Sequence, residues 1–110
     1  MRDDRERLLD ILEAIEKIEE RTMGDKELFQ RDEMVQVWVL YHVQIIGEAA
    51  GRISESLRNR YRHVPWPDVV AMRNLIAHHY FGVDLDQIWD AVTNDLPTLK
   101  AWTTQMLEDV

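Results

Sequence analysis

The sequence predicts an all-α protein, a small antiparallel bundle of four to five helices. Apolar residues recur at spacings of three and four through much of the chain, which is the period of an amphipathic helix. Residues 34–46 form an apolar run without a turn residue, too long for an ordinary buried strand. No repeat or linker interrupts the pattern. The 110 residues therefore suit one helical domain, residues 1–110.

The first helix is predicted from about Arg2 to Met23, with Gly24 as its end. Its apolar stripe consists of Leu8, Leu9, Ile11, Leu12, Ile15 and Ile18. The second helix is predicted from about Asp25 to Gly51. Its later half is apolar on nearly every side and therefore needs cover all round. We expect His42, inside that half, to be a hydrogen-bonded core residue.

A short helix or loop follows Arg52, and Pro65 and Pro67 suit the first turn of a third helix. That helix is expected to run to about Phe81, with Gly82 as its stop.

The start of the fourth helix is marked by Asp84, which can cap it, and by Gln87 in the position of a capping box. Val83 can pack against Ile88 as a hydrophobic staple. We expect Pro97 to kink or break this helix, because proline removes a hydrogen bond and clashes with the preceding turn.

Composition excludes several classes of protein. Without cysteine there can be no disulfide, thiolate nucleophile or Cys-ligated zinc site. No apolar run approaches a membrane span, and the first residues lack the apolar stretch of a secretory signal, so we expect a cytoplasmic protein.

The net charge of −8 is concentrated in the first and last segments of the chain. Residues 52–63 differ, because they carry several arginines against Glu55. These are Arg52, Arg58, Arg60 and Arg62. They are either a basic patch on an acidic body, and so candidates for RNA binding, or an ordinary solvated loop.

The most informative segment is residues 73–80, which place a cation, an amide, an imidazole and a phenol within about two helical turns. On a helical wheel, Val69 and Met72 face the core with Leu75 and Ile76. Asn74 and His78 lie on the other side, and Tyr80 lies beside Arg73. Between Arg73 and Asn74, Val70 and Ala77 form a small apolar strip that suits two-fold pairing of this helix with its copy.

Pairing would bring two histidines into one cleft, one to take a 2′-hydroxyl proton from RNA and one to protonate the leaving oxygen. Arg73 would stabilise the phosphorane charge. Asn74 could orient His78 or bind phosphate, and Tyr80 could position the phosphate or donate a hydrogen bond. The structural alternative is that Arg73 and His78 only satisfy carbonyls near the end of a helix.

The spelling of this segment, arginine, four residues, histidine, one residue, tyrosine, resembles the signature of HepT-like toxins in the HEPN superfamily. The resemblance covers nearly the whole chain. Its other parts are residues 46–50, Pro65-Trp66, Met72-Arg73-Asn74, Val83-Asp84 and Ile88-Trp89. In this pattern Gly47 belongs to a small-residue surface for close helix packing, and Glu48 is an acid that could hold an arginine.

The resemblance implies an all-helical homodimer acting as the toxin of a type VII-like toxin-antitoxin system. It implies a metal-independent endoribonuclease, with transfer RNA as a plausible substrate and Arg73 and His78 catalytic at the dimer cleft. Asn74 and Tyr80 would support them. It also implies a nucleotidyltransferase antitoxin that silences the toxin by transferring AMP to Tyr80.

Two alternatives remain beside the nuclease: a non-catalytic module that binds a nucleotide or its partner, and a purely structural dimer. Other chemistry-bearing residues favour structural roles. Asp84 is better explained as a cap than as part of a cation site with Asp86, and His63 is expected to be exposed. The tryptophans are more often core than stacking platforms; they are Trp38, Trp66, Trp89 and Trp102. We predict no metal and no cofactor.

Overall fold

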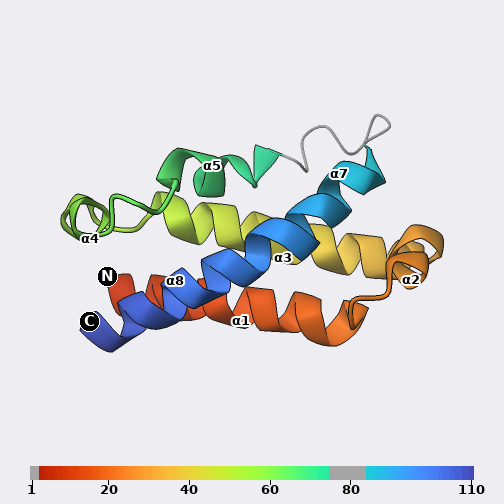
Figure 1. Ribbon diagram of the computed structural model, residues 1–110, viewed down its shortest axis with the longest axis horizontal. Coiled ribbons are helices and arrows are strands. Elements are labelled where there is room, and N and C mark those ends of the chain that lie inside the picture. Colours follow the sequence, from red (N-terminus) through yellow and green to blue (C-terminus); the bar gives the residue numbers. More distant parts are fainter. Residues whose placement is uncertain (1–2, 75–83) are drawn as a thin grey trace.

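The computed structural model describes residues 3–74 and 84–110, and these ranges contain helices and turns but no strand. Two long helices, α1 (Asp4–Thr22) and α3 (Glu33–Gly51), lie side by side and antiparallel. A third long helix, α8 (Leu96–Asp109), crosses this pair (Figure 1). The all-α bundle predicted from the sequence is therefore confirmed.

The first helix begins and ends close to the predicted positions. The Asp3 side chain accepts a hydrogen bond from the Glu6 backbone N–H, and so caps the helix. At the other end Met23 and Gly24 have φ angles of 48° and 70°, so the left-handed turn starts one residue before the expected glycine. The buried face contains Leu8, Ile11, Ile15 and Ile18, as the periodicity predicts. Two members of the predicted stripe differ: Leu12 is half-buried, and Leu9, at the edge of the stripe, is 43% exposed.

The predicted continuous helix 25–51 is wrong at one point. Asp32 has an extended conformation and separates α2 (Lys26–Arg31) from α3. Its carboxylate accepts hydrogen bonds from the backbone N–H groups of Met34 and Val35. The Asp32 carboxylate therefore caps a new helix. The sequence gave no sign of this break, because Asp32 is one charged residue within a polar stretch.

The segment after α3 forms a short helix, α4 (Glu55–Arg60), at one end of the bundle (Figure 1). Ser54 caps α4, and its backbone N–H and hydroxyl bind the two carboxylate oxygens of Asp4 at 2.9 and 2.5 Å. Helix α5 (Trp66–Ala71) follows, with its proline in the first turn as predicted. The predicted continuous helix to Phe81 is wrong at one point, because α5 ends at Ala71 and residues 72–73 form a turn. The continuation beyond residue 74 lies outside the described residues.

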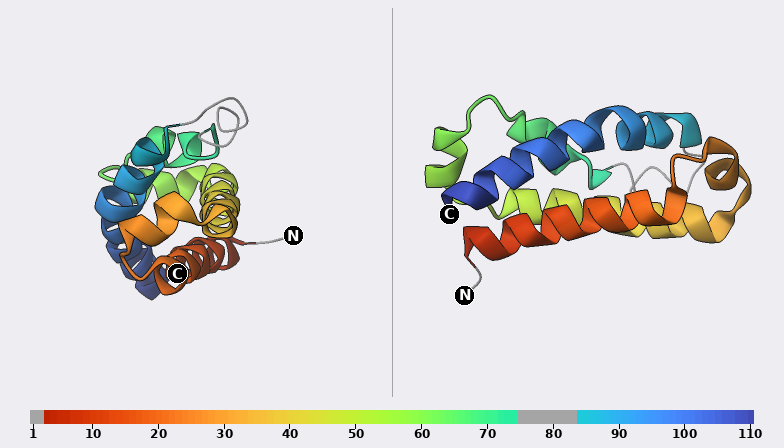
Figure 2. Two further views of the ribbon diagram at one scale, coloured as in Figure 1. Left: turned by 90° about the vertical axis from the view of Figure 1, so that its right-hand side faces the viewer. Right: turned by 60° about the horizontal axis from the view of Figure 1, so that its bottom comes forward.

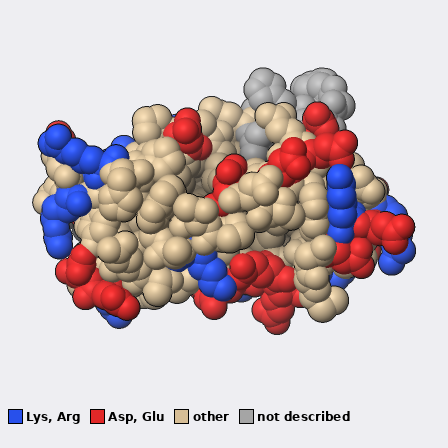
Figure 3. Space-filling model, in the orientation of Figure 1, with Lys and Arg blue, Asp and Glu red and all other residues tan. Residues whose placement is uncertain are grey.

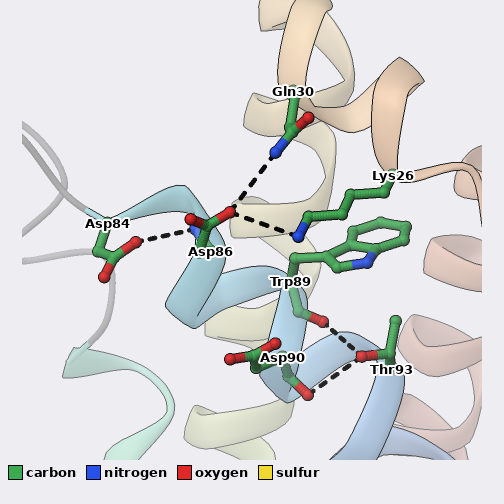
Figure 4. Close-up of polar contacts among 7 residues, drawn as sticks. All are labelled: Lys26, Gln30, Asp84, Asp86, Trp89, Asp90 and Thr93. Atoms are coloured by element: carbon green, nitrogen blue, oxygen red, sulfur yellow. Dashed lines mark hydrogen bonds and ion pairs between the residues drawn. The ribbon is translucent and has the colours of Figure 1, made fainter.

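Helix α7 (Leu85–Asp90) starts at the predicted cap, because the Asp84 carboxylate accepts a hydrogen bond from the Asp86 N–H. The expected staple involves Val83, which lies outside the described residues. Figure 4 shows how α7 is joined to α2: the Asp86 carboxylate lies 3.7 Å from Lys26 Nζ and 3.5 Å from Gln30 Nε2. Beneath these contacts the rings of Phe29 and Trp89 pack with centroids 5.2 Å apart.

Pro97 perturbs the fourth helix without ending it. A π-helical turn, η2 (Ala91–Asp95), joins α7 to α8 directly before the proline. Pro97 has no backbone N–H to donate to the Thr93 carbonyl, and the wider turn lets the chain remain helical at this point. The Thr93 hydroxyl donates a hydrogen bond of 2.9 Å to the Trp89 carbonyl (Figure 4). The predicted distortion is therefore present as a local change of helix type.

The buried apolar side chains of these helices form one core. The end-on view of Figure 2 shows the helices arranged around a common centre. His42 is buried within it and its Nδ1 lies 2.7 Å from the Trp38 carbonyl oxygen, as expected for a hydrogen-bonded core histidine. Trp66 and Trp89 are buried, but the expectation for Trp38 is wrong, since 40% of its surface is exposed. Within residues 3–74 and 84–110, no helix combines the length and apolar character needed to cross a membrane.

Candidate functional site

The structure describes the first two residues of the predicted site. Arg73 and Asn74 follow the last turn of α5, and both side chains are exposed. Residues 75–83 lie outside the described residues, and with them His78 and Tyr80. The roles assigned to those two side chains therefore remain predictions.

Arg73 lies against two glycines of α3. A Cβ added to Gly47 would lie 2.7 Å from the Arg73 backbone nitrogen and 2.8 Å from Arg73 Cβ, closer than such atoms approach. One helical turn further, a Cβ on Gly51 would lie 3.6 Å from a guanidinium nitrogen of Arg73. The glycines thus allow the backbone of Arg73 to approach α3 and its guanidinium to extend toward the end of that helix.

This packing explains part of the family-like pattern in the second helix and corrects another part. Gly47 belongs to a close-packing surface, as expected. Glu48, expected to hold an arginine, instead accepts a hydrogen bond from Gln44 at 3.3 Å. Val70, expected in a strip open to a second copy, is half-buried, and its side chain lies 3.8 Å from a Cβ added to Gly51. Val70 therefore packs partly on its own α3. Ala77, the other member of the strip, lies outside the described residues, so the pairing through this strip stays a prediction.

The four arginines predicted as RNA-binding candidates do not share one environment. Arg52 follows α3, and Arg60 and Arg62 lie at the end of α4 and just beyond it; all three are exposed. Figure 3 shows basic side chains gathered at the end of the molecule that holds α4. This distribution is compatible with a basic patch on an acidic body, and it leaves these three arginines as candidates.

Arg58 differs from the other arginines because its head group is used inside the protomer. It donates a hydrogen bond of 2.7 Å to the Ala50 carbonyl and lies 5.6 Å from the centre of the Trp66 ring. Its Nε is buried without a hydrogen-bond partner in the described structure. A cation bound to the carbonyl end of α3 and stacked on an indole stabilises the junction of α3, α4 and α5.

We therefore expect Arg58→Ala to lower the free energy of unfolding by about 1.5–3 kcal/mol, the contribution of a hydrogen bond to a charged group. Arg60→Ala, at an exposed position of the same helix, is the matched control and should change it by less than about 0.5 kcal/mol. Chemical denaturation of the three proteins measures both effects. Equal stability of the two variants would show that the Arg58 contacts contribute nothing.

Within residues 3–74 and 84–110, the remaining ionisable groups supply no further site. His63 is exposed, as expected. Among the described residues no three His, Cys, Asp or Glu side chains are grouped so as to hold a metal ion. A hydrogen bond of 2.7 Å to Glu19 raises the pKa of Lys100 above its usual value, but this pair joins α8 to α1 at the surface.

A groove of about 400 Å³ opens between α5 and the segment formed by α7, η2 and α8. Its floor is apolar and includes Met72, Leu99 and Trp102, while Asp68 and Asp95 add carboxylates. None of the described site candidates lines it, so it does not extend the Arg73 site.

Comparison with known proteins agrees with the resemblance found in the sequence. The family model described as ribonuclease HepT-like matches residues 11–106. A protein of Thermococcus cleftensis named probable ribonuclease HepT is 40% identical over 94 residues, covering 84% of this chain and 86% of its own. A Methanocaldococcus jannaschii protein whose name proposes an RNase is 36% identical with the same coverage.

A longer M. jannaschii protein, whose name joins gamma-glutamylcyclotransferase to a proposed RNase, is 38% identical over 101 residues. The match covers 91% of this chain but only 46% of that protein. No solved structure matches. Because the family model covers most of the chain and relatives of similar length share more than 30% identity, the chain belongs to the HepT-like ribonuclease family.

Proposed function

We propose that this protein is a metal-independent endoribonuclease and the toxin of a type VII-like toxin-antitoxin pair. The observation that carries the proposal is the family match over residues 11–106, which includes the complete arginine, histidine and tyrosine spacing of residues 73–80. The exposed position of the Arg73 guanidinium beside α3 supports it, because that cation is accessible to an RNA phosphate.

In the proposed reaction Arg73 binds the scissile phosphate and stabilises the charge that develops on the phosphorane. His78 accepts the proton of the neighbouring 2′-hydroxyl, which attacks phosphorus. The bond to the 5′-oxygen breaks, and a second imidazole protonates that oxygen. One protomer offers a single His78, so the cleft is proposed to form between two copies, each contributing Arg73 and His78. Asn74 and Tyr80 orient the imidazole and the phosphate.

Inactivation is proposed to occur by transfer of AMP from ATP to the Tyr80 hydroxyl, catalysed by a nucleotidyltransferase antitoxin, with pyrophosphate released. The transferred phosphate would pair with Arg73 and so occupy the position of the substrate phosphate. Exposed Arg52, Arg60 and Arg62 would bind the RNA backbone beyond the cleft.

The direct test is cleavage of end-labelled transfer RNA by purified protein in EDTA, with intact mass measured first to establish that Tyr80 carries no AMP. We expect cleavage products with 2′,3′-cyclic phosphate ends, because the 2′-hydroxyl is the nucleophile. Restored cleavage on adding Mg²⁺ to an inactive sample would overturn metal independence. Binding of RNA without cleavage, by unmodified dimeric protein, would favour the non-catalytic binding module.

A further inference from the structure

The groove of about 400 Å³ between α5 and the segment formed by α7, η2 and α8 is a binding site separate from Arg73 in its position and its chemistry. Helix α5 packs mainly against α3 and α8 packs mainly against α1, so the two helices border the groove without closing it. Figure 3 looks onto this side of the molecule, where acidic side chains lie beside a hollow. The volume is within the range of small-molecule sites.

The groove is long and narrow, because each wall is a stripe along one helical segment. The stripes consist of residues spaced by three and four: Pro65, Asp68, Val69 and Met72 on one wall, and Ala91, Asp95, Thr98, Leu99 and Trp102 on the other. A helical stretch from Ala91 to Trp102 is roughly 16 Å long. This shape suits an extended chain better than a compact ring system.

Its lining combines an apolar floor with charges of one sign. Buried Met72 and Leu99 contribute to the floor, and Trp102 is half-buried beside them. Asp68 and Asp95 are exposed and stand on opposite walls. Among the described lining residues there is no lysine, arginine or histidine to pair with these two carboxylates. The groove is therefore complementary to a cation that also has an apolar part.

Neither carboxylate is used inside the protomer. Asp95 stands where a cap of α8 would stand, but it makes no capping hydrogen bond. The reason is that η2 continues directly into α8, so the Leu96 N–H already donates to the Ala91 carbonyl. Asp68 lies in the first turn of α5. Within residues 3–74 and 84–110, neither side chain has a hydrogen bond or an ion pair, so both are available to a ligand.

We propose that this groove binds a polyamine, an aliphatic chain that carries two or more ammonium groups. Its ammonium groups pair with Asp68 and Asp95, and its methylene chain lies over Met72 and Leu99. The indole of Trp102 offers an aromatic surface to a further ammonium group. The inference does not depend on the proposed ribonuclease activity, because neither Arg73 nor Asn74 lines the groove.

Other classes of ligand fit these residues less well. Both aspartates would repel the phosphates of RNA. An extended peptide would bring backbone N–H and C=O groups that need partners, and beyond the carboxylates the described lining offers only the polar side chains of Gln87 and Thr98. A polyamine has only methylene groups between its amines, so an apolar floor leaves none of its polar groups without a partner.

The test is isothermal titration calorimetry of the protein with spermidine at about 0.15 M salt, which screens distant charges. We expect one site per chain, weakened about threefold to tenfold by Asp68→Asn and by Asp95→Asn. Asp90→Asn is the matched control, because it removes the same charge from an exposed position outside the lining. An absence of binding by the wild type, or an equal effect of all three substitutions, would overturn the inference.

Two further comparisons separate the groove from the general acidity of the chain. Hexaamminecobalt(III) has the same charge as spermidine but no methylene chain, so it should bind at least about tenfold more weakly. Thr98→Lys places a tethered ammonium in the groove and should weaken spermidine binding at least about tenfold. Thr104→Lys, at an exposed position of the same helix outside the lining, should leave it unchanged.

Equal affinity for the two trications, or equal effects of the two lysine substitutions, would show that surface charge alone attracts the ligand and would overturn the inference. A short peptide of alternating leucine and lysine that bound more tightly than spermidine would also overturn it, in favour of a basic protein segment. Circular dichroism of each variant checks that its fold is retained.

Discussion

Replacing His78 with alanine is expected to reduce RNA cleavage by about 10²–10⁴-fold, the usual contribution of a general acid or base. Arg73→Ala should cost about 10²–10³-fold, because the developing phosphorane charge loses its cation. His79→Ala is the matched control, since neighbouring residues on a helix point about 100° apart and only one imidazole can serve the same cleft. Single-turnover cleavage of labelled RNA, with dimerisation checked in parallel, measures all three.

Two results would contradict this assignment. Equal losses for His78→Ala and His79→Ala would show that the segment acts through its structure and not through one imidazole. Full activity of Arg73→Ala would remove the phosphate-binding role. Arg73→Lys is informative between these limits, because lysine keeps the charge but lacks the planar pair of donors; partial activity would indicate bidentate binding of phosphate.

Gly47→Ala is expected to lower the free energy of unfolding by about 1–3 kcal/mol and to impair cleavage as well. Its new methyl group would lie 2.7 Å from the Arg73 backbone nitrogen, and backbone cannot swing aside as a flexible side chain can. Arg73 would have to move away from α3, and its guanidinium would move with it.

Gly51→Ala is the control in the same helix. Its Cβ would meet Arg73 and Val70 only at 3.6 and 3.8 Å, ordinary contact distances. We therefore expect unchanged or slightly higher stability, by up to about 1 kcal/mol, since alanine is a better helix former. Chemical denaturation and single-turnover cleavage of both variants measure the difference. If both alanines had the same effect, close approach at Gly47 would not position Arg73.

The periodicity of the sequence predicted the fold well where burial decides the structure. The buried part of the α1 stripe, the Asp84 cap and the proline in the first turn of α5 depend on local chemistry that one sequence shows. The cover expected on every side of the apolar half of α3 is not present within the protomer, where Met34, Val37 and Tyr41 are more than half exposed. The break at Asp32 was missed because an aspartate within a charged stretch can either continue a helix or cap the next. Only the hydrogen bonds to Met34 and Val35 distinguish the two outcomes.

Long-range packing accounts for the other predictions that were wrong. Trp38 was expected in the core because tryptophan usually is, yet 40% of its surface is exposed, because the other sides of α3 are the ones covered by neighbouring helices. Arg58 was grouped with its arginine neighbours, and nothing in the sequence shows that it reaches back to the Ala50 carbonyl. For the candidate site, spacing identified Arg73, while its contact with Gly47 required the fold.

The hydrogen bonds from Arg5 to the Leu107 and Val110 carbonyls, 3.5 and 3.2 Å long, bring the start of α1 and the end of α8 to one pole of the bundle. Helix α4 lies at the same pole, while α2 and α7 meet at the opposite one (Figures 1 and 2). A domain fused to either terminus would therefore emerge in the same direction. Such additions would extend from one end of the bundle only. The flank formed by α1 and α3 would remain uncovered by them.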